Sequence, residues 1–156
     1  MKKILIALDY DPTAQKVAEE GYKIANSMKA EVVLLHIISD AMYYASREYS
    51  PIMGFTGFTD ISQPLMNNDK ELKIASIDFL EKSKSHLGDK DIKTLVKTGD
   101  KADTILEVAK EIKANIIVME SHSHKWIENV LLGSVTEKVL RHTTIPLFII
   151  PTKKTS

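Results

Sequence analysis

The sequence contains no cysteine, no long apolar run and no excess of charge of either sign. Without cysteine the chain can form no disulfide and offers no thiol nucleophile. Lys plus Arg and Asp plus Glu both number 21, so no overall basic field favours nucleic acid or a membrane surface. No apolar stretch approaches the length of a membrane span, and no positively charged leader is followed by an apolar segment of the length that a signal peptide needs. We therefore expect a soluble, cytoplasmic protein that binds neither nucleic acid nor membranes.

The length of the chain sets the expected domain organisation. Its 156 residues, of which 44% are hydrophobic, are enough for one domain with a sizeable buried core. We find no internal repeat and expect a single domain over residues 1–156.

Apolar runs and segments of helical spacing alternate along the chain. Apolar runs predict buried strands at Lys3–Leu8, Glu31–Ile38, Ile116–Met119 and Ile145–Ile150, with a weakly alternating strand at Asp91–Thr98. Helical spacing predicts helices over Pro12–Met28 (capped by Asp11), over Leu65–Leu87 (ended by Gly88), after Asp100 and from Ser134. This alternation predicts an α/β, Rossmann-like fold: a five-stranded parallel sheet in the order 3-2-1-4-5, with four helices on both faces.

The candidate ligand site is the polar loop that follows Ile116–Met119 and ends at Gly133 and Ser134. In α/β proteins, ligands bind at the C-terminal ends of strands and at helix N-termini. Ser134 and Glu137 have the spacing of a capping box, so Ser134 can cap its own helix.

Alternatively, Gly133 lets the backbone come close to an anion. The amides of Ser134 and Val135 and the hydroxyls of Ser134 and Thr136 then bind phosphate oxygens. The two interpretations are compatible, because a helix N-terminus has several free amides.

Four segments together resemble the universal stress protein family over essentially the whole chain. They are Asp9 after the first strand, LLHII in the second, TGDKADTILEVAKE, and the block IIVMESHSHKWIENVLLGSVTEKVLRHTTIPLFIIP. Nucleotide-binding members of that family carry G-x2-G-x9-G-[ST] in the last block. Here the x9 spacing and Gly133-Ser134 are present, whereas Glu120 and Ser123 occupy the first two glycine positions.

The resemblance implies a stress-response protein that binds ATP, ADP or AMP. Asp9 would face the ribose or adenine, the backbone near Ile37 would face the adenine, and Ala7 and Leu8 would form its apolar wall. The implied site comprises Ala7, Leu8, Asp9, Ile37, Met119, Glu120, Ser123, Gly133, Ser134, Val135 and Thr136. For Asp9 the alternative is a strand-end carboxylate that accepts loop amides.

The departures from the motif predict weaker binding of ATP. Two lost glycines remove backbone freedom, and a Glu120 carboxylate at about 5 Å from phosphate costs roughly 3 kcal/mol per unit charge at an effective dielectric of ~20. We expect AMP to be penalised less than ATP, and Mg²⁺ or Mn²⁺ to help the triphosphate.

Other features are assigned to structure rather than to chemistry. His122, His124 and Glu120 could face one side of an extended loop, but a solvated polar loop is the commoner explanation, so we predict no dedicated metal site there. Half of the aromatic residues lie between Ser39 and Pro64, where they cover a core edge or subunit contact or, alternatively, form a ligand lid.

No arrangement of residues indicates nucleophilic catalysis, so we expect no enzyme beyond a slow ATPase. Two hypotheses stand: a regulatory adenine-nucleotide-binding protein, and a nucleotide-independent interaction module of the same fold. In either case Ile145–Ile150 would lie at a sheet edge with one row of backbone groups unpaired. We expect two copies to pair through this strand as a homodimer.

Overall fold

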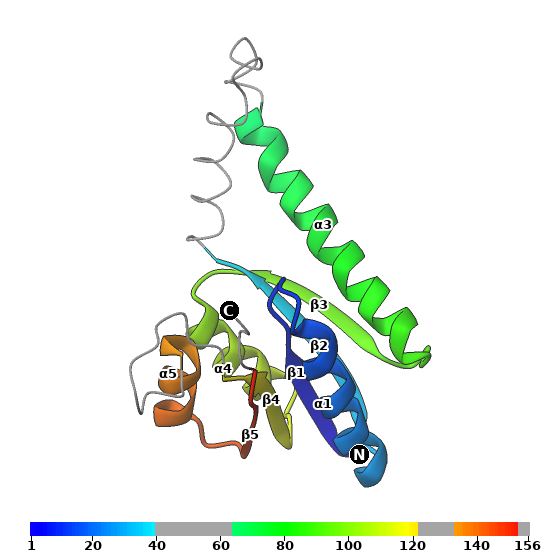
Figure 1. Cartoon of the computed structure of the whole chain (residues 1–156). Coiled ribbons are helices and arrows are strands. Elements are labelled where there is room, and N and C mark those ends of the chain that lie inside the picture. Colours follow the sequence, from blue (N-terminus) through cyan, green and yellow to red (C-terminus); the bar gives the residue numbers. More distant parts are fainter. Residues whose placement is uncertain (40–63, 122–132, 153–156) are drawn as a thin grey trace.

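The computed structural model describes residues 1–39, 64–121 and 133–152 (Figure 1). Its elements follow the chain in the order β1 (Lys3–Ala7), α1 (Ala14–Met28), β2 (Glu31–Ile38), α3 (Pro64–Leu87), β3 (Lys93–Thr98), α4 (Lys101–Glu111), β4 (Ile116–Glu120), α5 (Ser134–His142) and β5 (Leu147–Ile150). The segment 40–63, with the aromatic residues discussed above, lies outside the described residues, as do Ser123, His122 and His124.

The five strands form one parallel sheet in the order β3-β2-β1-β4-β5, which confirms the predicted order. Ile6 of β1 lies opposite Leu34 of β2 and Val118 of β4. Because the chain builds outward from β1 to β3 on one side and from β4 to β5 on the other, the strand order reverses between β1 and β4. Ligands of open α/β sheets bind at the carboxyl ends of the strands at such a reversal.

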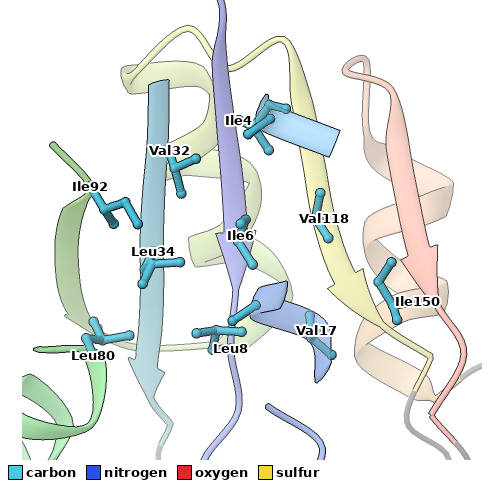
Figure 2. Packing of buried hydrophobic residues seen from close by; sticks show 12 residues of the cluster. Ile4, Ile6, Leu8, Val17, Val32, Leu34, Leu80, Ile92, Val118 and Ile150 are labelled. Atoms are coloured by element: carbon cyan, nitrogen blue, oxygen red, sulfur yellow. The ribbon is translucent and has the colours of Figure 1, made fainter. Parts of the chain in front are cut away.

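Helices cover both faces of the sheet, as predicted (Figure 1). Ile4, Ile6 and Leu8 of the β1 segment point into one core with Val17 of α1 and Leu80 of α3 (Figure 2). The second core lies on the opposite face, where Leu5 and Val33 join Ile105 of α4 and Val139 of α5. The alternation follows from the period of two residues along a strand.

Gly21 explains how closely α1 packs on the sheet. A Cβ atom at this position would lie 2.7 Å from Cδ1 of Ile6 and 3.2 Å from Cγ1 of Val118. Glycine therefore allows the helix to lie directly on β1 and β4, and this fixes the loop between β1 and α1 above the ends of the strands.

Two of the helix ends predicted from the sequence are confirmed, and a third prediction is wrong. Asp100 caps α4 by accepting from Asp103 N at 2.9 Å, and Gly88 ends α3 with a φ of +71°. Asp11 is not the N-cap of α1, because that helix begins at Ala14 after Thr13. Asp11 Oδ1 instead accepts from Thr13 N at 2.9 Å, in a turn that precedes the helix.

Three strands are shorter than predicted: β1 ends at Ala7, β3 begins at Lys93 and β5 begins at Leu147. Pro146 has no amide to donate to the sheet, and Ile145 N bonds to Thr143 Oγ1 at 2.9 Å instead. Within the described ranges, no helix combines the length and the apolar character that crossing a bilayer requires.

Candidate functional site

Three carboxylates meet at the C-terminal ends of β1 and β4. Asp9 and Asp11 belong to the loop after β1, and Glu120 is the last residue of β4. One carboxylate oxygen from each lies within 4.8 Å of the others. The sequence predicted Asp9 and Glu120 as site residues but assigned Asp11 only to a helix cap. The available signal was that parallel strands end at one edge, which brings acids after β1 close to acids at the end of β4.

The Glu120 side chain is turned inward and is only 4% exposed. Its Oε2 accepts from Thr13 Oγ1 at 2.7 Å and from Thr152 Oγ1 at 3.3 Å. Burial, and after it the neighbouring Asp11 carboxyl, raises the pKa of Glu120 to about 8, against an opposing effect of the Thr13 hydroxyl. The group is therefore mostly protonated at pH 7, and the negative charge predicted at this position is reduced.

Thr13 connects two of the carboxylates. Its Oγ1 lies within hydrogen-bonding distance of both Asp11 Oδ1 and Glu120 Oε2. One hydroxyl proton can serve only one of these acceptors at a time. The second contact needs a proton on a carboxyl group, which agrees with the raised pKa of Glu120.

Asp9 pairs with a cation from the neighbouring helix. Its Oδ1 accepts from Nζ of Lys101, the first residue of α4, at 3.1 Å. Its carbonyl, rather than its carboxylate, accepts the loop amide of Asp11 at 2.9 Å. The proposed structural alternative for Asp9, a carboxylate that accepts loop amides, is therefore replaced by an ion pair. No pattern in the sequence indicates Lys101 as the partner of Asp9.

The N-terminus of α5 lies against the end of β4. Gly133 N donates to Ser121 O at 3.1 Å, and Thr136 Oγ1 donates to Glu120 O at 2.7 Å. The first intrahelical bond runs from Glu137 N to Gly133 O. The amides of the three preceding helical residues, Ser134 to Thr136, therefore belong to the positive end of this helix.

Three predictions about this helix are corrected. Gly133, not Ser134, is the N-cap, and no side chain caps the helix, so the capping box is wrong. Glu137 instead pairs with Arg141, one turn further along. The Thr136 hydroxyl is 2% exposed and engaged with the Glu120 carbonyl, so it anchors the helix rather than binding phosphate.

Gly133 has φ −69° and ψ 163°, an extended conformation open to any residue. The backbone angles therefore do not require glycine at this position. The absence of a Cβ atom is the feature that would let a ligand approach the backbone closely. Ser134 is exposed and Val135 half-buried beside it.

The predicted apolar wall is divided between the two faces of the sheet. Ala7, Ile37 and Met119 belong to the core beneath α4 and α5. The side chain of Leu8, which is 2% exposed, points into the opposite core, so it does not share that wall with Ala7. The Leu8 carbonyl lies 2.8 Å from Nδ1 of the buried His36.

Comparison with known proteins gives one consistent result. The model of the universal stress protein family matches residues 1–151. Universal stress protein MJ0577 of Methanocaldococcus jannaschii is 29% identical, over 97% of this chain and 96% of that protein. The solved structure of MJ0577 superposes with a TM-score of 0.71 at 25% identity, covering 99% of this chain and 98% of the other.

Two more distant structures share the fold. One is a universal stress protein in complex with cAMP, with a TM-score of 0.66 at 18% identity, covering 97% of this chain and 98% of the other. The other is the universal stress protein from Archaeoglobus fulgidus in complex with dAMP, with a TM-score of 0.57 at 16% identity, covering 96% and 98%.

Proposed function

Because the chain belongs to the universal stress protein family, we propose that it is a regulatory protein of the stress response that binds an adenine nucleotide. The observation that carries this proposal is the position of the α5 N-terminus. Hydrogen bonds from Gly133 N and Thr136 Oγ1 fasten it to the end of β4, where the strand order reverses. The amides of Ser134 and Val135 there form an anion site. The proposal places this protein in the cytoplasm and makes it a binding protein rather than an enzyme.

Structures of the same fold support this class of ligand. The two complexes with cAMP and dAMP show that proteins of this fold bind adenine nucleotides. Their similarity to this chain is one of fold, so the proposal extends to the class of ligand and takes its residues from this chain alone. Those residues are Ala7, Asp9 and the backbone near Ile37 for the nucleoside, with the α5 amides for phosphate.

The carboxylates of Asp9 and Asp11 set the preference among nucleotides. Repulsion between a phosphate charge and one carboxylate at about 5 Å weakens binding by roughly 3 kcal/mol at an effective dielectric of ~20. Lys101 offsets part of the Asp9 charge. Since each added phosphate increases the repulsion, the expected order of affinity without a metal ion is AMP, then ADP, then ATP. Mg²⁺ or Mn²⁺ would raise the affinity for ATP most.

Mass spectrometry of the natively purified protein tests the proposal directly, because a retained nucleotide would appear as a defined added mass. Calorimetry of the nucleotide-free protein with AMP, ADP and ATP, with and without Mg²⁺, then gives the order of affinity. Binding of none of the three would contradict the proposal. ATP turnover under the same conditions would contradict its non-enzymatic part.

A second candidate function is an interaction module that acts as a homodimer without nucleotide. It is favoured by β5, which pairs with β4 on one side and is an edge strand of the described sheet. Phe148 in the middle of this strand is 47% exposed, whereas Ile150 is 8% exposed. Antiparallel pairing of two copies would join the outer backbone groups of β5, which pair with no other strand of the described sheet, and would cover Phe148.

A further inference from the structure

We propose that Asp9, Asp11 and Glu120 form a binding site for a hard divalent cation, Mg²⁺ or Mn²⁺, that needs no nucleotide. The three carboxylate oxygens lie within 4.8 Å of one another. Opposite ligands of an octahedral Mg²⁺ are about 4.2 Å apart, because each lies at about 2.1 Å from the ion. Neighbouring ligands of the same ion are about 3.0 Å apart, so at least two of the three oxygen pairs must come closer when the ion binds, by up to about 1.8 Å each.

An independent observation concerns Glu120 Oε1. Within the described part of the chain, this oxygen is buried and has no hydrogen-bond partner, although its residue is only 4% exposed. A buried polar atom without a hydrogen bond destabilises the folded chain, and more so when the atom is charged. A cation bound between the three groups would satisfy the oxygen.

The surrounding hydrogen bonds hold each carboxylate in place. The hydroxyls of Thr13 and Thr152 hold Glu120 Oε2, Thr13 N holds Asp11 Oδ1, and Lys101 Nζ holds Asp9 Oδ1. Metal ligands are oriented by outer hydrogen bonds of this kind. Each of the three groups therefore has one oxygen fixed by the protein.

The charge and the type of the ligands favour Mg²⁺ or Mn²⁺. Carboxylates, with no nitrogen or sulfur ligand among the three, suit hard cations. When all three are ionised, the Lys101 ammonium leaves two negative charges, which match one divalent ion. Mg²⁺ usually keeps several water ligands, so three protein ligands are sufficient. Asp9 and Asp11 are half-buried and therefore leave a route of entry.

Titration of the nucleotide-free full chain with MnCl2 tests the site, with free Mn²⁺ measured by electron paramagnetic resonance. We expect one Mn²⁺ per chain, displaced by MgCl2, and a higher Tm in the presence of either ion. Glu120→Gln keeps the shape of the side chain and should weaken Mn²⁺ binding at least tenfold, as should Asp11→Asn. Glu107→Gln, the same substitution at an exposed position of α4, should leave binding unchanged.

Two results would overturn the inference. One is a wild-type chain that binds no Mn²⁺ at millimolar concentration. The other is Glu120→Gln binding Mn²⁺ as tightly as the wild type, which would place the ion elsewhere, for example at His122 or His124. Melting of the variants in metal-free buffer shows that they are folded. Because no nucleotide is present, the result does not depend on the proposed function.

Discussion

Thr13 Oγ1 lies 2.7 Å from Glu120 Oε2, so the residue before α1 is bonded to the last residue of β4, 107 positions further along the chain. This bond joins the two strand ends between which the sheet reverses its order. It holds a buried carboxyl next to two other acids.

Replacing Glu120 with glutamine should stabilise the metal-free protein. The amide has the shape of the carboxyl, cannot ionise, and can donate to the neighbouring Asp11 or Asp9 carboxylate. Removing the burial cost of the acid and satisfying one oxygen should raise the free energy of unfolding by about 1–3 kcal/mol at pH 7. Urea denaturation of Glu120→Gln, with Glu107→Gln as the control, measures this. A lower stability of Glu120→Gln would show that the carboxyl itself holds the loop together.

Placing a negative charge at Ser134 should weaken nucleotide binding without unfolding the protein. Ser134 is exposed in the first turn of α5, where an acid stabilises the helix by about 0.3–1 kcal/mol. The same charge repels phosphate, so Ser134→Glu should bind AMP at least about tenfold more weakly by calorimetry. Ser134→Gln is the neutral control of similar size. Equal AMP affinity in the two variants would exclude this helix end as the phosphate site.

The buried His36 should make the protein less stable at mildly acidic pH. Burial lowers the pKa of His36, and of the charged groups that face it, Asp9 raises the pKa and Lys101 lowers it. The unfolded chain takes up the proton below pH about 6.5, whereas the folded chain resists it. Stability is therefore fully present above that pH and falls as the pH decreases below it, by at most about 1.4 kcal/mol per pH unit.

His36→Asn tests this contribution, because its amide can still donate to the Leu8 carbonyl and does not titrate. Its free energy of unfolding should change less between pH 7 and pH 5 than that of the wild type. His86→Asn replaces an exposed histidine on α3. The free energy of unfolding of this variant should fall between pH 7 and pH 5 by as much as that of the wild type. An unchanged pH dependence in His36→Asn would assign the acid sensitivity to other groups.

Phe148→Asp should prevent dimer formation. The side chain is 47% exposed on the edge strand β5, where a carboxylate would face its own copy across the two-fold axis. Sedimentation equilibrium at micromolar concentration should give a dimer for the wild type and a monomer for this variant. Ile74→Asp is the matched control, since Ile74 on α3 is 65% exposed and should not affect association. A monomeric wild type, or a dimeric Phe148→Asp, would exclude β5 as the interface.

The sheet could be predicted from the sequence because burial on both faces demands continuous apolar strands, as in Ile4–Ile6 and Val32–Ile38. The start of α5 beside the reversal of strand order could also be predicted, because Gly133 and Ser134 follow the fourth apolar run. The contacts between the individual side chains at these strand ends could not be predicted. Asp11 has the sequence context of a helix cap, and only the register of Ile6 with Val118 brings its loop to Glu120.

Side-chain direction was the other missing information. Thr136 occurs at the position of a phosphate-binding hydroxyl, but the helix turns it toward the Glu120 carbonyl. Leu8 follows Ala7 directly, and the two nevertheless face opposite cores, because side chains alternate along a strand. Lys101 lies 92 residues from Asp9, and no local pattern marks that pair.

Glu120 contacts three separate parts of the chain. Its side chain accepts from Thr13 in the β1–α1 loop and from Thr152, two residues after β5, and its carbonyl accepts from Thr136 in α5. A cation bound to the three carboxylates would therefore contact Glu120, and the same side chain accepts a hydrogen bond from Thr152 next to the proposed dimer strand. By thermodynamic linkage, a cation that favours association of two chains must itself bind the dimer more tightly, by the same factor.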